Sequence, residues 1–145
     1  MRDDILKLEN QLCFPLYAAA KKIISKYTPF LDELNLTYTQ YITMMVMWQY
    51  AEVTVSELGR LLYLDSGTLT PLLKKLEEKG FIRRERSDAD ERKVIVRITE
   101  NGSKLKEAAV EVPLKMRKCL PLSGDDAKTL YELLYKILIG EEKYE

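Results

Sequence analysis

Apolar side chains recur every three or four positions through most of this chain, which is the spacing of amphipathic helices. Over residues 4–34 the pattern predicts a long first helix, which Pro15 should kink or break because proline removes a backbone donor. A second helix is expected over residues 39–50, where methionines and aromatic side chains at helical spacing indicate core. Two more helices are expected near the C-terminal end, over residues 99–116 and 123–139.

The middle of the chain predicts two short helices with a tight connection. Thr54 stands three residues before Glu57, the spacing of a capping box, and should begin the first helix. Asp65 or Ser66 should cap the second helix, which Gly80 would end. Two such helices form a helix-turn-helix.

After Gly80 the helical period of the apolar side chains ends. Residues 81–86 and 93–98 alternate apolar and charged side chains around a polar connection, which predicts a β-hairpin. The predicted fold class is therefore mainly α with a small β-hairpin, a winged helix-turn-helix, and residues 1–145 are expected to form a single domain.

Composition narrows the classes of function. The 145 residues carry no net charge and contain no histidine, and the two cysteines, Cys13 and Cys119, lie far apart in sequence. Neither a zinc finger nor a histidine-dependent catalytic triad is expected, and no cofactor is expected. The N-terminal residues lack the order of a secretory signal and no long apolar run follows, so we expect a cytoplasmic protein that does not enter a membrane.

Positive charge gathers in one segment, because nine basic side chains stand against six acidic ones between Lys74 and Arg97. In a helix-turn-helix the start of the second helix meets base edges, while cations further along and in a wing reach phosphates or the minor groove. Each residue alone could simply cap a helix or face solvent, but the ordered set favours duplex DNA binding by about residues 54–98. The candidates are Asp65, Ser66, Thr68, Thr70, Lys74, Lys75, Arg84, Arg86, Arg92 and Lys93.

The helix-turn-helix and two wing motifs resemble the MarR family of transcription regulators. The motifs are Asp-Glu-Arg at 90–92 and Val-Arg-Ile-Thr-Glu-Asn-Gly at 96–102, with Ile98 where the family usually has leucine. The resemblance implies a homodimer bound to double-stranded operator DNA. It also implies that the helices of about residues 4–34 and 100–140 interlock as a dimerisation region.

Three blocks, residues 8–14, 36–41 and 64–74, resemble the organic hydroperoxide resistance regulators, a group within that family. In this group organic hydroperoxide is the inducer: it oxidises an N-terminal cysteine, and the repressor leaves its operator. Pro15 stands where alanine is common in the group, and Thr39 where proline often occurs. The redox-sensing residues that the resemblance implies are Cys13, Tyr17, Tyr27 and Tyr38.

The residue types suit the implied chemistry. A thiolate attacks the O–O bond, and a helix N-terminus together with phenolic donors favours the anion without competing charge. The resemblance implies that Tyr27 and Tyr38 supply these donors across the dimer interface. Leu12, Phe14 and Leu16 would favour organic hydroperoxides over hydrogen peroxide. An isolated cysteine would more simply be a small buried hydrophobic residue.

Cys119 lies just before Pro121, near the end of the fifth expected helix. Its position is similar to that of the second cysteine in family members that form a disulfide between subunits. The resemblance therefore implies a resolving cysteine, and a lone surface thiol is the alternative.

Competing interpretations use the same residues. A regulator of this fold could answer a small aromatic ligand or another thiol oxidant, with Cys13 incidental. A thiol peroxidase would use the two cysteines catalytically, but it would not need a recognition helix and a basic wing, so an enzyme is not expected. A purely structural dimer module would leave the basic segment unexplained.

Overall fold

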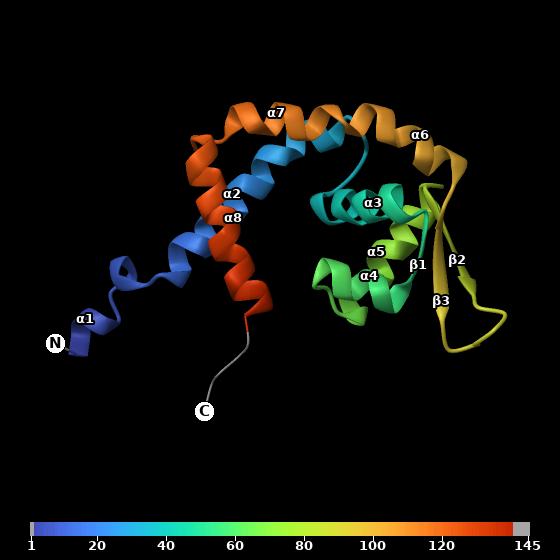
Figure 1. Cartoon of the computed structure of the whole chain (residues 1–145), viewed down its shortest axis with the longest axis horizontal. Coiled ribbons are helices and arrows are strands. Elements are labelled where there is room, and N and C mark those ends of the chain that lie inside the picture. Colours follow the sequence, from blue (N-terminus) through green and yellow to red (C-terminus); the bar gives the residue numbers. More distant parts are fainter. Residues whose placement is uncertain (1, 141–145) are drawn as a thin grey trace.

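The computed structural model describes residues 2–140, so residues 1 and 141–145 of the predicted domain lie outside the described part. Within it the helices are α1 (Arg2–Ile5), the 3-10 helix η1 (Leu8–Asn10), α2 (Cys13–Asp32), α3 (Tyr38–Tyr50), α4 (Val55–Leu62), α5 (Ser66–Glu78), α6 (Glu100–Ala109), α7 (Glu111–Cys119) and α8 (Gly124–Ile139). The strands are β1 (Glu52–Thr54), β2 (Ile82–Arg86) and β3 (Val94–Ile98). Figure 1 shows α6 and α7 bridging two parts: α2 and α8 on one side, and α3 to α5 with the sheet on the other.

The N-terminal segment differs from the single helix predicted over residues 4–34. The chain breaks before Pro15, not at it, and Pro15 lies in the first turn of α2, where its missing donor has no helical partner to lose. The side chain of Gln11 holds the break, because its Nε2 donates to the carbonyl oxygens of Ile5 at 2.6 Å and Lys7 at 2.9 Å. A side chain that takes over backbone acceptors in this way ends a helix that the apolar pattern alone would continue.

The helix-turn-helix is confirmed as α4 and α5, with both predicted caps. The Glu57 N–H donates to Thr54 Oγ1 at 3.1 Å, and the Thr54 N–H donates to Glu57 Oε2 at 3.0 Å. Asp65, rather than Ser66, caps α5 by accepting from the Thr68 N–H at 2.8 Å. Tyr63 makes the turn between the helices at φ 56°, a left-handed conformation that non-glycine residues adopt rarely.

The predicted hairpin is confirmed as β2 and β3, and the sheet has a third strand that was not predicted. The strand order is β1-β3-β2, all antiparallel, with Val53 of β1 opposite Val96 of β3. β1 has three residues, too few to show an alternating pattern. We call residues 52–98, which run from β1 through α4, α5 and β2 to β3, the winged part.

The Thr-x-x-Gly motif after β3 attaches the winged part to α6. Thr99 Oγ1 donates to the Gly80 carbonyl at 2.6 Å and accepts from the Gly102 N–H at 3.1 Å. A Cβ on Gly102 would lie 2.2 Å from the Phe81 carbonyl oxygen, so glycine is required here. Trp48 Nε1 donates to the Gly102 carbonyl at 2.8 Å and ties the same point to α3.

One helix was predicted over residues 99–116, but the structure has two, α6 and α7. They meet at Val110, three residues before Pro113, and α7 continues to Cys119. Pro113 falls in the first turn of α7, where it is tolerated, while it could not have continued α6. The last predicted helix is confirmed as α8, capped by Ser123 Oγ, which accepts from the Asp126 N–H at 3.1 Å.

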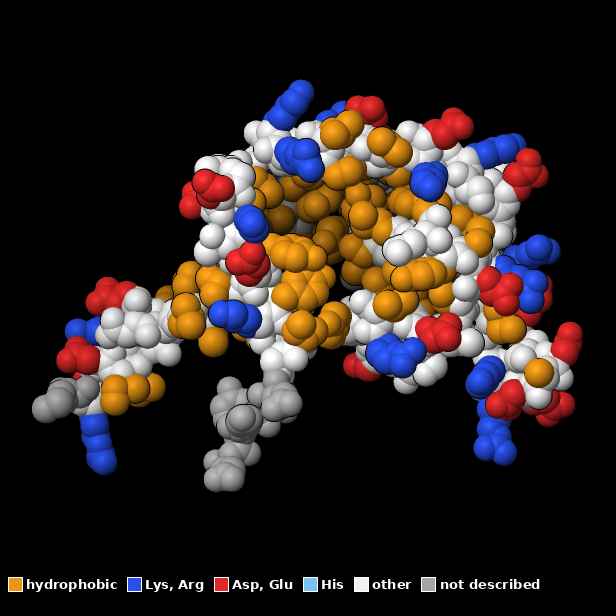
Figure 2. All heavy atoms as spheres, in the orientation of Figure 1, with side chains coloured by type: hydrophobic (Ala, Val, Ile, Leu, Met, Phe, Trp, Pro, Cys, Tyr) orange, Lys and Arg blue, Asp and Glu red, His pale blue; other side chains and the backbone are white. Residues whose placement is uncertain are grey.

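The hydrophobic core lies in the winged part and where α3, α2 and α7 cover it. Leu58, Leu73, Leu76 and Val96 are at most 1% exposed. By contrast α8 has no buried residue, and Figure 2 shows apolar side chains gathered over it, beside a hollow that faces the winged part. No helix among residues 2–140 is long and apolar enough to cross a membrane.

Candidate functional site

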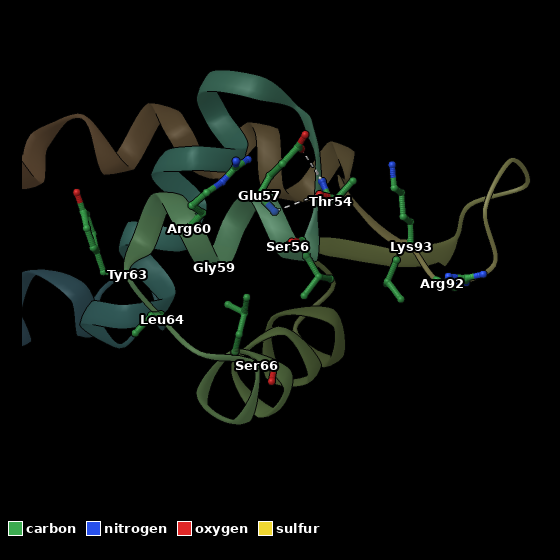
Figure 3. Close-up of a pocket in the computed structure, with 13 residues that line it drawn as sticks. Thr54, Ser56, Glu57, Gly59, Arg60, Tyr63, Leu64, Ser66, Arg92 and Lys93 are labelled. Atoms are coloured by element: carbon green, nitrogen blue, oxygen red, sulfur yellow. Dashed lines mark hydrogen bonds between the residues drawn. The ribbon is translucent and has the colours of Figure 1, made fainter. Parts of the chain in front are cut away.

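A groove of about 970 Å³ lies between α4, the start of α5 and the wing. Figure 3 shows where its polar side chains come from: α4 supplies Ser56 and Arg60, α5 supplies Ser66, and the wing supplies Arg92 and Lys93. Side chains with hydroxyl and cationic groups from three segments therefore line one concave surface. Such a surface suits a phosphate backbone better than an apolar ligand.

The predicted recognition residues of α5 lie at its exposed N-terminal end and along one side. Ser66, Thr68, Thr70, Lys74 and Lys75 are all exposed. Thr70 Oγ1 donates back to the Ser66 carbonyl at 2.9 Å.

The carboxylate of Asp65 is engaged as the cap of α5. The hydrogen bond from the Thr68 backbone N–H, followed by that from the Thr68 side chain, lowers the pKa of Asp65 below its usual value. Asp65 therefore fixes the exposed N-terminal end of α5.

The hairpin cations fall into two groups. Arg92 is exposed, and its N–H donates to Asp90 Oδ1 at 3.0 Å, so the Asp-Glu-Arg motif orders the tip that presents this arginine. Arg86 Nη1 donates to the Glu91 carbonyl at 3.1 Å across the same tip. Arg84 instead is half-buried and pairs with Glu77 of α5, with 3.2 Å between Nη2 and Oε1. Arg84 thus joins the wing to α5, and it is the candidate least available to DNA.

Sequence reasoning missed Ser56 and Arg60. They are four residues apart on α4 and therefore share a face of that helix. That spacing, on the first helix of a predicted helix-turn-helix, is the signal that would have found them.

Three tyrosines form a cluster between α2 and α3. The Tyr27 and Tyr38 ring centroids are 5.0 Å apart, and Tyr41 lies 5.9 Å from Tyr27 and 6.3 Å from Tyr38. Burial raises the pKa of Tyr27 and Tyr38, and burial with the two neighbouring phenols raises the pKa of Tyr41 to about 12. All three phenols therefore keep their protons near neutral pH and can donate hydrogen bonds.

Cys13 lies far from this cluster within one chain. It is exposed and is the first residue of α2, whose N-terminal end has no side-chain cap. Tyr27 is fourteen residues further along the same helix, roughly 21 Å at 1.5 Å per residue. Tyr17, one turn after Cys13, is exposed and lies under Lys21, with 5.2 Å from Nζ to the ring centroid. The structure of one chain thus places Tyr17, but not Tyr27 or Tyr38, near Cys13.

Cys119 ends α7 and is a partly buried free thiol. Lys26 Nζ of α2 donates to the Cys119 carbonyl at 2.9 Å. This bond satisfies one of the carbonyls that a helix C-terminus leaves open, and it fixes the end of α7 to α2. Within residues 2–140, no group of three or more His, Cys, Asp or Glu side chains could hold a metal ion.

Comparison with known sequences and structures identifies the family. The family model for the transcriptional regulator SarA/Rot matches residues 25–109. The organic hydroperoxide resistance transcriptional regulator of Bacillus subtilis is 48% identical over 135 residues, which are 93% of this chain and 92% of that protein.

Solved structures of AbfR, a protein of Staphylococcus epidermidis, share the fold at 36% identity. Reduced AbfR bound to DNA superposes with a TM-score of 0.79, over 95% of this chain and 96% of that one. The disulfide-formed AbfR gives 0.65, over 95% and 94%. The matched relatives are regulators of transcription and not enzymes, and the fold is that of the winged-helix MarR group. The chain therefore belongs to the MarR-like regulators that the SarA/Rot family model describes, and it groups with the organic hydroperoxide resistance regulators.

Proposed function

We propose that this protein is a homodimeric repressor that binds operator DNA and leaves it when an organic hydroperoxide oxidises Cys13. The observation that carries the proposal is the separation of Cys13 from the tyrosine cluster along α2. A thiol and its donors at opposite ends of one helix meet only if a second copy brings its own α2 alongside in the opposite direction.

The exposed apolar side chains support this assembly. Phe14 and Leu16 are 43% and 42% exposed beside Cys13, and Leu133 and Ile137 of α8 are 51% and 67% exposed. Apolar faces of this extent on two long helices mark an interaction surface. In the dimer they would cover one another and place Cys13 of each chain in an apolar pocket.

The proposed reaction is a two-electron oxidation of sulfur. The Cys13 thiolate attacks the outer oxygen of the hydroperoxide, the O–O bond breaks, and the alkoxide leaves as alcohol after taking a proton. Cys13 becomes a sulfenic acid. The start of α2 and the protonated phenols of Tyr27 and Tyr38 from the other chain would stabilise the attacking anion, and Tyr17 would line the same pocket.

Cys119 would complete the oxidation. Its thiolate would attack the sulfenic sulfur of Cys13 in the other chain, which forms a disulfide and expels hydroxide that leaves as water after taking a proton. A disulfide needs Cα atoms within about 7 Å, and the bond between Lys26 and the Cys119 carbonyl would restrain the end of α7 as it moves to that separation. The similarity to AbfR, whose disulfide-formed structure superposes less well than its DNA-bound form, supports a change of shape between the two states.

The winged part would read the DNA. Ser66, Thr68 and Thr70 at the start of α5 would enter the major groove, with Lys74 and Lys75 on the flanking phosphates. Arg86, Arg92 and Lys93 would reach the adjacent minor groove, while Ser56 and Arg60 would hold the backbone strand between the grooves.

A second candidate trigger rests on a separate pocket. An apolar pocket of about 400 Å³ lies between α3 and the α6–α7 junction, lined among others by Tyr41, Trp48 and Val110. Its size suits a small aromatic ligand, which would release DNA without oxidation of Cys13.

The deciding experiment is a gel shift on the DNA upstream of the protein's own gene, with and without cumene hydroperoxide. Wild type should bind when reduced and be released by the hydroperoxide, and Cys13→Ser should bind equally and stay bound. Release of Cys13→Ser would favour the aromatic-ligand trigger. Continuous consumption of hydroperoxide with a thiol reductant would indicate an enzyme instead of a sensor.

A further inference from the structure

Lys79 joins the end of the recognition helix α5 to the start of α3. It is the C-cap residue of α5, and its Nζ donates to the Asn35 carbonyl at 2.5 Å and to Gln40 Oε1 at 2.8 Å. We propose that Lys79 is the positioning residue that couples the tyrosine cluster to the recognition helix, so that a displacement of Tyr38 changes how α5 meets DNA. This inference rests on the function proposed above.

Gln40 connects Lys79 to Tyr38 through the cap of α3. Gln40 Oε1 also accepts from the Thr37 N–H at 3.1 Å, and the Gln40 N–H donates to Thr37 Oγ1 at 3.3 Å. Tyr38 is the first residue of α3 and lies inside this closed loop of hydrogen bonds. A movement of Tyr38 that shifts the first turn of α3 must therefore move the acceptor of Lys79.

The bridge has little freedom to rearrange in place. Gln40 is 2% exposed, so water cannot readily replace Lys79 at its amide oxygen. Asn35 lies in a left-handed turn at φ 55°, which fixes the direction of its carbonyl. Burial, and then repulsion from Lys75, lowers the pKa of Lys79, which agrees with an ammonium that lies partly out of water beside these neutral acceptors.

The ammonium keeps this position because charge-assisted hydrogen bonds are about twice as strong as neutral ones. When the first turn of α3 shifts, one of two things must happen. Either Lys79 moves with its acceptors and tilts α5, or its partly buried ammonium loses both hydrogen bonds. Either outcome changes the end of α5 that α3 supports.

Lys79 does not need to touch DNA for this role. The end of α5 proposed to enter the major groove is Ser66, and Lys79 lies roughly 20 Å away along the helix at 1.5 Å per residue. A small tilt at the Lys79 end would therefore be enlarged at the other end. Lys79 thus acts through the orientation of α5.

The test compares Lys79→Met, which keeps the aliphatic stem and removes the donors, with wild type. Three quantities are measured: affinity of the reduced dimer for operator DNA, the rate at which cumene hydroperoxide sulfenylates Cys13, and affinity after oxidation. We expect the first two to stay within about threefold of wild type, while the loss of affinity on oxidation becomes about tenfold smaller. Lys79→Arg, which keeps a cation with several donors, should lose as much DNA affinity on oxidation as wild type does.

The matched control is Lys104→Met, an exposed lysine of α6 paired with Glu100, which should behave as wild type in all three measurements. If Lys79→Met leaves DNA on oxidation as fully as wild type, the coupling is refuted. If Lys79→Met loses its fold or its reduced affinity, Lys79 is a structural support, which also overturns the proposal. Failure of the unmutated protein to leave DNA would refute the proposed function itself, and that result is visible without any variant.

Discussion

The winged part and the terminal helices differ in how much of their apolar surface a single chain buries. In the winged part Leu69, Leu76 and Ile82 are at most 1% exposed, and the caps of both helices are satisfied by their own neighbours. In α8 no side chain is buried, and the N-terminal half of α2 is exposed as well. One chain is therefore enough to build the surface proposed to read DNA, whereas the proposed sensing pocket would be completed by a second chain.

In the proposed function, this difference would let oxidation of the thiol change how the protein binds DNA. A pocket formed by two chains changes when their relative position changes, whereas a core that is complete in one chain moves as a unit. We therefore expect oxidation to reposition winged parts that remain folded. Substitutions in the core of the winged part should then lower folding stability, whereas substitutions on the terminal helices should prevent dimerisation.

The largest effect is expected from Leu76→Ala in α5. Leu76 is fully buried, and the cavity left by its side chain should lower the free energy of unfolding by ~2–5 kcal/mol. Urea denaturation followed by circular dichroism measures this loss. A loss below about 1 kcal/mol would contradict a core completed by one chain.

The next effect is expected from Ile137→Lys in α8, which is 67% exposed in one chain. A charge on the proposed interface should give monomers with an intact helical spectrum. Affinity for a two-half-site operator should fall about a hundredfold, because the two winged parts no longer bind together. Light scattering and fluorescence anisotropy measure both quantities.

Leu61→Lys is the matched control for that experiment. Leu61 is 47% exposed in α4, which lies in the winged part, and its replacement should leave the protein dimeric. Monomers of Leu61→Lys, or dimers of Ile137→Lys, would reverse the assignment of the two regions.

A smaller effect is expected from Asp65→Ala at the start of α5. The pKa of Asp65 is lowered in the folded protein, so its stabilisation is present above the unfolded value of 3.8 and is lost as pH falls through the folded value. Wild type should therefore melt above Asp65→Ala at pH 7, and the two melting temperatures should converge under acid conditions. Asp125→Ala, in the first turn of α8 where Ser123 supplies the cap, is the control. A difference in melting temperature that is independent of pH would contradict the role of the carboxylate.

The smallest effect is expected from Lys26→Met, which removes the bond to the Cys119 carbonyl. The end of α7 should move more easily, so the disulfide should form roughly two- to fivefold faster after sulfenylation. Non-reducing gels sampled over time measure this rate, with the exposed Lys22→Met as control. An unchanged rate would mean that the end of α7 does not limit the reaction.

The sequence predicted best what is decided locally. The caps at Thr54 and Asp65 and the hairpin of β2 and β3 depend on nearby sequence, and the structure confirms them. β1 was missed because its pairing with β3 joins residues more than forty positions apart. The break before Cys13 was misplaced because it depends on where the side chain of Gln11 turns.

The residues of the candidate site also divide into those that local sequence predicts and those that it does not. The exposed positions of α5 and the wing follow from local pattern, but the pairing of Arg84 with Glu77 and the bridge from Lys79 to Gln40 appear only in three dimensions. Side-chain bonds between different helices and strands leave no periodic trace in the sequence. For Cys13 and the tyrosines, resemblance to relatives supplied the hypothesis of a shared pocket. The structure of one chain does not bring these residues together.

The most direct test of that hypothesis uses heterodimers of one Cys13→Ser chain and one chain with Tyr27→Phe and Tyr38→Phe. Such a dimer holds a single Cys13, on the chain that lacks the two phenols, and it faces the intact tyrosines of the other chain. The measurement is the rate of its sulfenylation by cumene hydroperoxide, compared with wild type and with the Tyr27→Phe, Tyr38→Phe homodimer. We predict the wild-type rate, because the donors come from the opposite chain. A rate as slow as that of the doubly substituted homodimer would show that Cys13 depends on tyrosines of its own chain, and would contradict the account.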